Sequence, residues 1–386
     1  MHRRLFLALT GTSTGISGRL GNDDELWGPQ NQEGYTHPTD GPEVTVRDIR
    51  TLEYDRPVWL DSDGTLYGRA GSQITRSDNW WKTTERLYDF EDAGTVHGIL
   101  TTDEGRIIAG VGRSIYVSDP TQAEFERVYE FDRGRFPFTF GHAIHDETIV
   151  IGSYQADGYE DGAYAGDVIL SRDGGETWDH VYELPFRDRD ANIHIHDVEV
   201  DPFGDRLWIV AGHGKNGQVA YSEDWGETWV DVWDGGGAPA LTQVVAFEDH
   251  VSFGTDTIPE GIWRWDRDTG GPHEPEDIAI PYVQIEDEIE PNELRYVARR
   301  RWHDRDTGLC LMPFGANRDW AHSCVLATDG GDEWHEIYRH PEPGRDAFHL
   351  TNCIGPLPDD DDRRILITES CCEGVVIDAS LPELEA

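Results

Sequence analysis

The sequence has very little lysine and no long apolar stretch. Its 386 residues include 76 Asp and Glu against 32 Lys and Arg, a formal net charge of −44, and only Lys82 and Lys215 are lysines. No apolar run reaches the roughly 18 residues that a membrane-spanning helix needs. A surface this acidic repels phosphate groups, so nucleic acid is excluded as a partner. Disorder is excluded as well, because 14 Trp, 14 Tyr and 13 Phe supply a hydrophobic core.

The acidic composition and the scarcity of lysine together indicate that the chain folds at high salt concentration. Self-repulsion at this net charge destabilises a compact state in dilute buffer. At about 1 M salt the Debye length falls to about 3 Å and most of that repulsion is screened. Acidic composition with Arg in place of Lys resembles the proteins of salt-loving archaea, so we expect a halophilic protein. An ordinary acidic secreted protein is the alternative.

The amino terminus reads as an export signal. Arg3 and Arg4 precede a weakly apolar stretch, so that residues 1–18 are similar to a twin-arginine signal. This predicts an exported protein, extracellular or at the cell surface; an unstructured tail is the alternative. Residues 19–44, rich in Gly, Asn, Asp and Pro, are interpreted as a linker.

Cysteines are few, and none forms a Cys-x-x-Cys pair, which argues against a structural zinc site. The five lie late in the chain, at Cys310, Cys324, Cys353, Cys371 and Cys372. In an exported protein, Cys310 with Cys324, and Cys353 with one of the last two, could form disulfides, but the sequence does not give the connectivity. Five buried thiols are the alternative.

A short motif recurs along the chain. Residues 169–184, 220–234 and 325–338 contain good copies of Ser-x-Asp-x-Gly-x-Thr-Trp, and worn copies begin at Ser77 and Ser118. Ser and Asp side chains bond turn amides, Gly allows positive φ, and Trp covers the apolar side of a hairpin. This pattern resembles the Asp-box, or bacterial neuraminidase repeat, of sialidase-like β-propellers. We interpret as structural the residues Ser171, Asp173, Gly175, Thr177, Trp178, Ser222, Asp224, Gly226, Thr228, Trp229, Asp329, Gly331 and Trp334.

Around the motif, units of four short strands repeat, and no segment shows a sustained helical period. The last unit has three strands, and the segment 44–51 is predicted to supply its fourth strand and close that blade. The fold class is therefore all-β: residues 45–386 form one seven-bladed β-propeller with four-stranded antiparallel blades. Six blades are the alternative, because unit 237–281 lacks the motif. The units fall near 55–90, 94–131, 138–185, 193–234, 237–281, 295–341 and 347–382.

In a propeller of this family the first strand of each blade is innermost, and ligands bind at the face away from the Asp-boxes. That resemblance gives the ligand-binding candidates His97, His142, His196, His213, Asp256, Arg299, Arg300, His349 and Glu369. The histidines His97, His142, His196 and His349 open first strands, and a ring of imidazoles is a candidate site for a divalent metal. The alternative is that a repeated histidine bonds the backbone of a neighbouring strand.

Whether the protein is an enzyme stays open at this point. A sialidase requires three Arg to clamp the sugar carboxylate, a Tyr with a Glu partner and an acid Asp, and the Arg-Ile-Pro motif of the family is absent. Other Asp-box propellers, receptor ectodomains and photosystem assembly factors among them, are non-catalytic. The leading hypothesis is an exported, monomeric module that binds a glycan, small molecule or protein at the channel mouth. A sialidase-like glycoside hydrolase is the first alternative, and a metal-dependent enzyme using the His ring is the second.

Overall fold

The protein is all-β. The computed structural model describes residues 42–384 except for the segments 53–55, 132–137, 139–140, 155–165, 185–193, 213–216, 235–240, 257–260, 275–276, 285–295, 299, 317–321, 341–350, 358–359 and 370–374. Helix within these described residues is limited to short 3-10 turns, of which Glu91–Ala93 and Arg267–Thr269 are described in full. No helix among them is long and apolar enough to cross a membrane.

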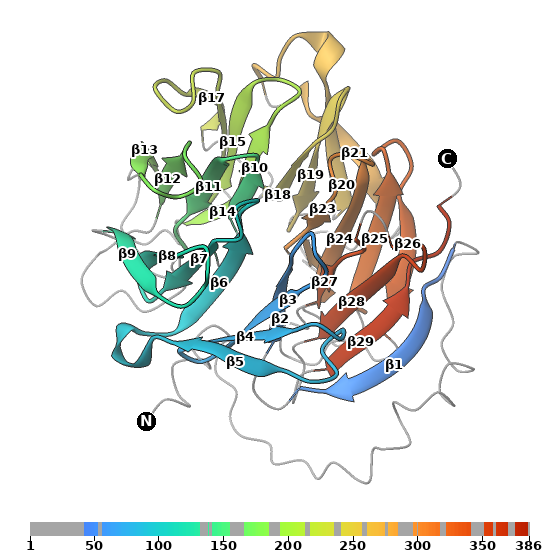
Figure 1. Cartoon of the computed structure of the whole chain (residues 1–386). Coiled ribbons are helices and arrows are strands. Elements are labelled where there is room, and N and C mark those ends of the chain that lie inside the picture. Colours follow the sequence, from blue (N-terminus) through green and yellow to red (C-terminus); the bar gives the residue numbers. More distant parts are fainter. Residues whose placement is uncertain are drawn as a thin grey trace, which may run out of the picture. The chain divides into compact units, whose positions relative to one another are not determined.

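Seven antiparallel sheets, each built on a path of four strands, make up a seven-bladed β-propeller (Figure 1). This confirms the predicted fold class and the higher of the two predicted blade numbers. The chain divides into two compact units, which we describe separately: unit 1 is Met1–Glu53 with Leu294–Ala386, and unit 2 is Tyr54–Glu293.

Unit 2 contains five sheets, and in each the strands follow one another in chain order. The first sheet is β2 (Arg56–Leu60), β3 (Leu66–Ala70), β4 (Gln73–Ser77) and β5 (Glu85–Asp89). The second is β6 (Val96–Thr101), β7 (Ile107–Val111), β8 (Ser114–Ser118) and β9 (Phe125–Glu130). The third is β10 (His142–His145), β11 (Thr148–Gly152), β12 (Asp167–Ser171) and β13 (Asp179–Glu183). The fourth is β14 (Ile195–Asp201), β15 (Arg206–Ala211), β16 (Gln218–Ser222) and β17 (Val230–Asp234). The fifth is β18 (Leu241–Ala246), β19 (His250–Thr255), β20 (Gly261–Asp266) and β21 (Ala279–Gln284).

In each of the first three sheets the last strand is the least buried. Every residue of β6 and β14 is buried, whereas β9 and β13 are mostly exposed or half-buried. Strands covered on both faces must fill both faces with packed side chains, which explains their continuous apolar runs. The first strands β6, β14 and β18 are fully buried, whereas the first strands β2 and β10 are partly half-buried.

A buried ion pair between Asp201 and Arg267 joins the fourth and fifth sheets. The buried carboxylate of Asp201 accepts hydrogen bonds from Trp208 Nε1 at 3.0 Å and from Arg267 Nη2 at 2.8 Å. Beside it, the Arg206 guanidinium lies 4.5 Å from the Tyr221 ring centroid and 5.2 Å from that of Trp265. A buried carboxylate needs such a partner, because a lone charge in the core is costly.

Unit 1 contains two sheets. One is β22 (Tyr296–Ala298), β23 (Trp302–His303), β24 (Leu309–Ala316), β25 (Cys324–Asp329) and β26 (His335–Arg339), in which β22 and β23 both pair with β24. The other is β1 (Thr45–Thr51), β29 (Val375–Ser380), β28 (Arg364–Glu369) and β27 (Thr351–Ile354), in that order.

The amino-terminal strand completes the last sheet, as predicted. β1 runs antiparallel to β29 from Thr45 opposite Ser380 to Thr51 opposite Val375 (Figure 1). Val46 and Ile49 of β1 pack against the hydrophobic core of unit 1. β1 therefore covers an edge that would otherwise present unpaired amides and apolar side chains to another chain.

The motif residues form hydrogen-bonded turns between the third and fourth strands. Ser171 Oγ accepts from Gly175 N at 2.8 Å, and Asp173 Oδ1 accepts from Thr177 N at 2.9 Å. The Trp178 indole Nε1 donates to the Gly175 carbonyl at 2.9 Å. All the polar groups of this motif are therefore engaged in holding the turn.

The copy in the fourth sheet repeats the serine and aspartate contacts. Ser222 Oγ accepts from Gly226 N at 2.7 Å, and Asp224 Oδ1 accepts from Thr228 N at 2.7 Å. In the copy of unit 1 the serine position holds Ala327, and the neighbouring Thr328 Oγ1 accepts from Gly331 N at 2.9 Å instead.

Of the two alternatives that the sequence leaves open for Cys310 and Cys324, a disulfide or free thiols, the structure has free thiols. Both are buried thiols, as is Cys353. Cys310 is opposite Thr328, whereas Cys324 is opposite Phe314, so the two cysteines lie four ladder positions apart. That offset is about 13 Å along the strands, beyond the reach of a disulfide. Cys353, which the sequence leaves free to pair with Cys371 or Cys372, is not disulfide-bonded either, and those two lie outside the described residues.

Candidate functional site

Three of the predicted histidines lie at equivalent places in unit 2. His97 is the second residue of β6, His142 opens β10 and His196 is the second residue of β14, and all three are buried. Asp256, also buried, follows the end of β19. These positions share one end of their sheets, opposite the ends that carry the motif turns.

The remaining candidates are distributed as follows. Arg300 lies between β22 and β23, and Glu369 is the last residue of β28, both in unit 1. His213, Arg299 and His349 lie outside the described residues.

The imidazoles of unit 2 contact different neighbours. The His142 ring packs 5.2 Å from Phe138 and 6.2 Å from Trp59, measured between ring centroids. Across the described ranges, no group of three or more metal-ligating side chains with donor atoms within 4.8 Å includes His97, His142 or His196.

His196 instead pairs with His194, a residue that the sequence interpretation missed. Their Nε2 atoms are 2.9 Å apart, and His196 Nδ1 lies 2.8 Å from the Leu241 carbonyl oxygen. A carbonyl only accepts, so His196 Nδ1 carries a proton and, in the neutral ring, its Nε2 accepts from His194. The backbone of the next sheet therefore fixes the tautomer of both rings.

The ring of Tyr154 contacts this histidine pair from the third sheet. Its ring centroid lies 4.2 Å from that of His194, and it follows the end of β11 in the third sheet. Tyr154, His194 and His196 thus form an aromatic and hydrogen-bonding cluster between the third and fourth sheets. The His-x-His spacing at 194–196 was the available sequence signal, because alternate residues of a strand share a face.

A second cluster, Arg56, Arg69 and His97, lies at the same end of the first and second sheets. Arg56 of β2 and Arg69 of β3 are directly opposite in the ladder, and Arg69 Nη1 donates to the Val96 carbonyl at 3.2 Å. Burial, and then the charge of Arg56, lowers the pKa of Arg69 to about 10. Burial, and then the charge of Arg69, lowers the pKa of His97 to about 3, so this imidazole is neutral at pH 7.

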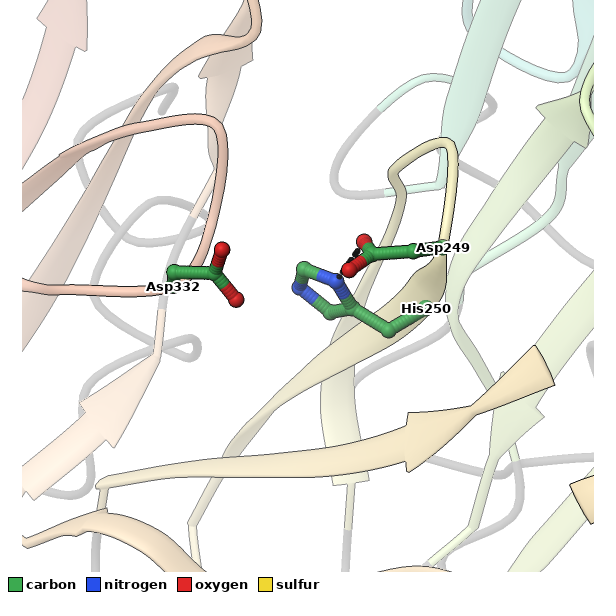
Figure 2. A group of neighbouring side chains, drawn as sticks. All are labelled: Asp249, His250 and Asp332. Atoms are coloured by element: carbon green, nitrogen blue, oxygen red, sulfur yellow. Dashed lines mark hydrogen bonds and ion pairs between the residues drawn. The ribbon is translucent and has the colours of Figure 1, made fainter. Parts of the chain in front are cut away.

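The opposite end of the unit carries a different ionic pair. Figure 2 shows the side chains of Asp249 and His250 at the turn before β19, where His250 Nδ1 lies 2.5 Å from Asp249 Oδ1. Burial opposes ionisation of Asp249, but its bond to His250 and the charge of Arg264 outweigh it and hold the pKa below its usual value. The His250 ring stacks on Phe247 with centroids 4.7 Å apart. This pair lies at the turn between first and second strands, away from the candidate site.

Comparison with known proteins supports the fold. No protein-family model matches the chain, and no curated protein matches it. Among solved structures, one chain of the crystal structure of a mitotic checkpoint complex shares 9% identity with a TM-score of 0.58, covering 96% of this chain and all of that one (100%). YCF48 bound to D1 peptide shares 10% identity with a TM-score of 0.52, covering 90% of this chain and 99% of that one. A prolyl endopeptidase structure shares 13% identity with a TM-score of 0.50; this chain covers 51% of that one, about half its length. At such low identities these likenesses show the propeller fold and nothing finer.

Proposed function

We propose that this protein is a ligand-binding β-propeller whose site lies at the end of the unit 2 sheets where the first strands begin. The observation that carries the proposal is the cluster of Tyr154, His194 and His196, in which aromatic faces and imidazole nitrogens meet at that end. The motif turns at the opposite end use their polar groups for their own hydrogen bonds, so they offer less to a ligand. A site that combines aromatic faces with hydrogen-bonding groups suits sugars and peptides, which present both kinds of surface.

The class of ligand is a glycan or a peptide. Resemblance of the motif to the Asp-box of sialidase-like propellers favours a glycan. The similar fold of YCF48, which was solved bound to a D1 peptide, favours a peptide. Export through the twin-arginine-like residues 1–18 would place either ligand outside the cell or at its surface.

A ligand screen in high salt tests the proposal. Glycans and short peptides are added to the full chain in about 1 M KCl, where charge repulsion is screened, and binding is followed by a shift in melting temperature. We expect saturable binding that Tyr154→Ala weakens. Asp249→Ala, at the opposite end, is the matched control and should leave binding unchanged. If Asp249→Ala weakens binding and Tyr154→Ala does not, the site lies elsewhere. If neither glycans nor peptides bind, the proposal is wrong.

The same preparation decides between binding and catalysis. Turnover of chromogenic glycosides would replace the binding function by glycoside hydrolysis. Turnover that disappears with a chelator and returns with a divalent metal would indicate a metal-dependent enzyme using the first-strand histidines. Binding without turnover supports the proposal.

A further inference from the structure

We propose that His194 and His196 chelate a divalent metal ion of the copper(II) kind between their Nε2 atoms. His194 precedes β14 and His196 is the second residue of that strand, in the fourth sheet of unit 2. Both residues are almost fully buried, with 1% and 4% of their surface exposed. The inference goes beyond the proposed function, because binding of a metal requires neither a glycan nor a peptide.

The first argument is the distance between the two nitrogens. Alternate residues of a strand share a face, and the Nε2 atoms of this pair point at each other from 2.9 Å. Metal–imidazole bonds are about 2.0–2.1 Å long, so a metal bonded to both nitrogens would subtend an angle of about 90°. The pair therefore has the spacing of a two-nitrogen chelate.

The angle also selects the class of metal. A tetrahedral ion needs about 109° between its ligands, which at these bond lengths corresponds to about 3.3 to 3.4 Å between the nitrogens. Right angles belong to the tetragonal sites of copper(II) and nickel(II). Copper(II) binds most tightly of the divalent first-row metals to a given set of ligands, so we take it as the ion that fits best.

The second argument is the tautomer of His196. Its Nδ1 donates to the Leu241 carbonyl at 2.8 Å, which leaves Nε2 as the nitrogen with a lone pair. A ligating histidine usually donates its other ring N–H to a carbonyl or carboxylate in this way, which fixes the ring toward the metal. The backbone of β18 thus supplies the outer support that such a ligand needs.

The third argument is that the metal needs only the contact that the two imidazoles already make with each other. It takes the place of the proton between the Nε2 atoms, and His194 then carries its proton on Nδ1, as a neutral imidazole that binds through Nε2 does. The bond from His196 to Leu241 and the packing of Tyr154 on His194 stay in place. Water or an oxygen of a ligand fills the other positions on the metal.

The charge around the pair also suits a cation. The net charge of −44 raises the concentration of cations at the protein surface. His97, at the corresponding place of the second sheet, differs because the charge of Arg69 acts on it. A positive neighbour disfavours a metal ion there, so we assign the metal to the pair in the fourth sheet alone.

Electron paramagnetic resonance of the full chain with less than one equivalent of CuSO4, in about 1 M KCl, tests the inference. The chain carries His2→Asn, because a histidine next to an N-terminal amine chelates copper by itself. The pair is buried, so the sample is incubated until the signal is constant. We expect hyperfine splitting from two nitrogens, which copper on surface carboxylates lacks, and a higher melting temperature that a chelator reverses.

Substitution of either histidine should remove this signal. His194→Asn and His196→Asn should each weaken copper binding more than about a hundredfold, because loss of an outer partner alone costs about ten- to a hundredfold. His194→Asn keeps the bond from His196 to Leu241, so it separates loss of the metal from loss of folding. His145→Asn, at the other end of β10, removes a single histidine and should bind copper like the parent chain.

Two results would overturn the inference: a copper signal without nitrogen splitting in the parent chain, or an unchanged affinity in His194→Asn with the melting temperature of the metal-free parent. If copper does not bind while glycans or peptides do, and Tyr154→Ala weakens them, the metal site is wrong and the proposed function stands. If copper binds the pair and neither class of ligand binds, with or without the metal, the proposed function is wrong and this inference stands.

Discussion

At the scale of the residue, the motif turns depend on a hydrogen-bond acceptor more than on a charge. In the worn copy of the first sheet, Asn79 stands where the good copies have Asp, and its Oδ1 still accepts from Thr83 N at 3.0 Å. Ser77 Oγ there accepts from Trp81 N at 3.0 Å, as serine does in the other copies. The amide oxygen thus reproduces the geometry that a carboxylate gives elsewhere.

This comparison predicts the effect of changing Asp173. Asp173→Ala removes the acceptor for Thr177 N and should cost about 1 kcal/mol of stability, by analogy with the loss of a helix cap. Asp173→Asn should cost about half of that or less, because the amide keeps the acceptor. Urea unfolding in high salt measures both, and equal costs would show that the charge itself holds the turn.

Burial of His97 predicts a dependence of stability on pH. Because burial lowers the folded-state pKa of His97 from 6.5 to about 3, the unfolded chain binds a proton first as the pH falls. Stability is therefore lost from about pH 6.5 downwards, by up to about 2 kcal/mol between pH 6.5 and pH 5.

The measurement is urea unfolding at pH 7.5 and pH 5 for the protein and for His97→Asn. Carboxylates titrate in both proteins, so the difference between them isolates the imidazole. We expect the variant to lose less stability on acidification; equal losses would contradict neutral burial of His97.

At the scale of the element, the pairing of β1 with β29 is expected to stabilise the last sheet and to prevent self-association. The strand covers β29 and adds Val46 and Ile49 to the core of unit 1. Without it, β29 becomes an edge of mostly buried residues, the kind of strand that recruits another chain.

Truncation tests this role. A protein that begins at Pro42 should keep its melting temperature, whereas one that begins at Tyr54 should melt lower and self-associate. Light scattering during size-exclusion chromatography measures the association. A monomer of unchanged stability starting at Tyr54 would show that β1 is dispensable.

At the scale of the whole molecule, the net charge of −44 makes stability depend on salt. Repulsion among carboxylates is long-ranged in dilute buffer and largely screened at about 1 M salt, where the Debye length is about 3 Å. We expect the melting temperature to rise steeply with KCl at low concentration and to flatten as screening is completed.

Potassium sulfate at matched ionic strength is the control for ion-specific effects. The rise at low ionic strength should be the same for both salts, because screening depends on ionic strength alone. A melting temperature independent of salt would contradict a halophilic protein.

Part of the site could be predicted from the sequence, and part could not. Placement of His97 and His196 at the starts of inner strands follows from counting strands around a repeated motif. The tautomer of His196 could not be predicted, because it depends on the Leu241 carbonyl in the next sheet. The state of the cysteines could not be predicted for a similar reason: the register of β24 against β25 separates two cysteines that are near in sequence.

The sequence by itself determined the fold class, because the turn chemistry of the motif and the period of the strands are local properties repeated many times. It also determined the acidic surface, since net charge is a sum over residues. Only the tertiary structure decided which side chains meet, for example that Arg69 lies opposite Arg56 and close to His97. Such an arrangement depends on the packing of strands from different sheets, and no spacing along the chain encodes it.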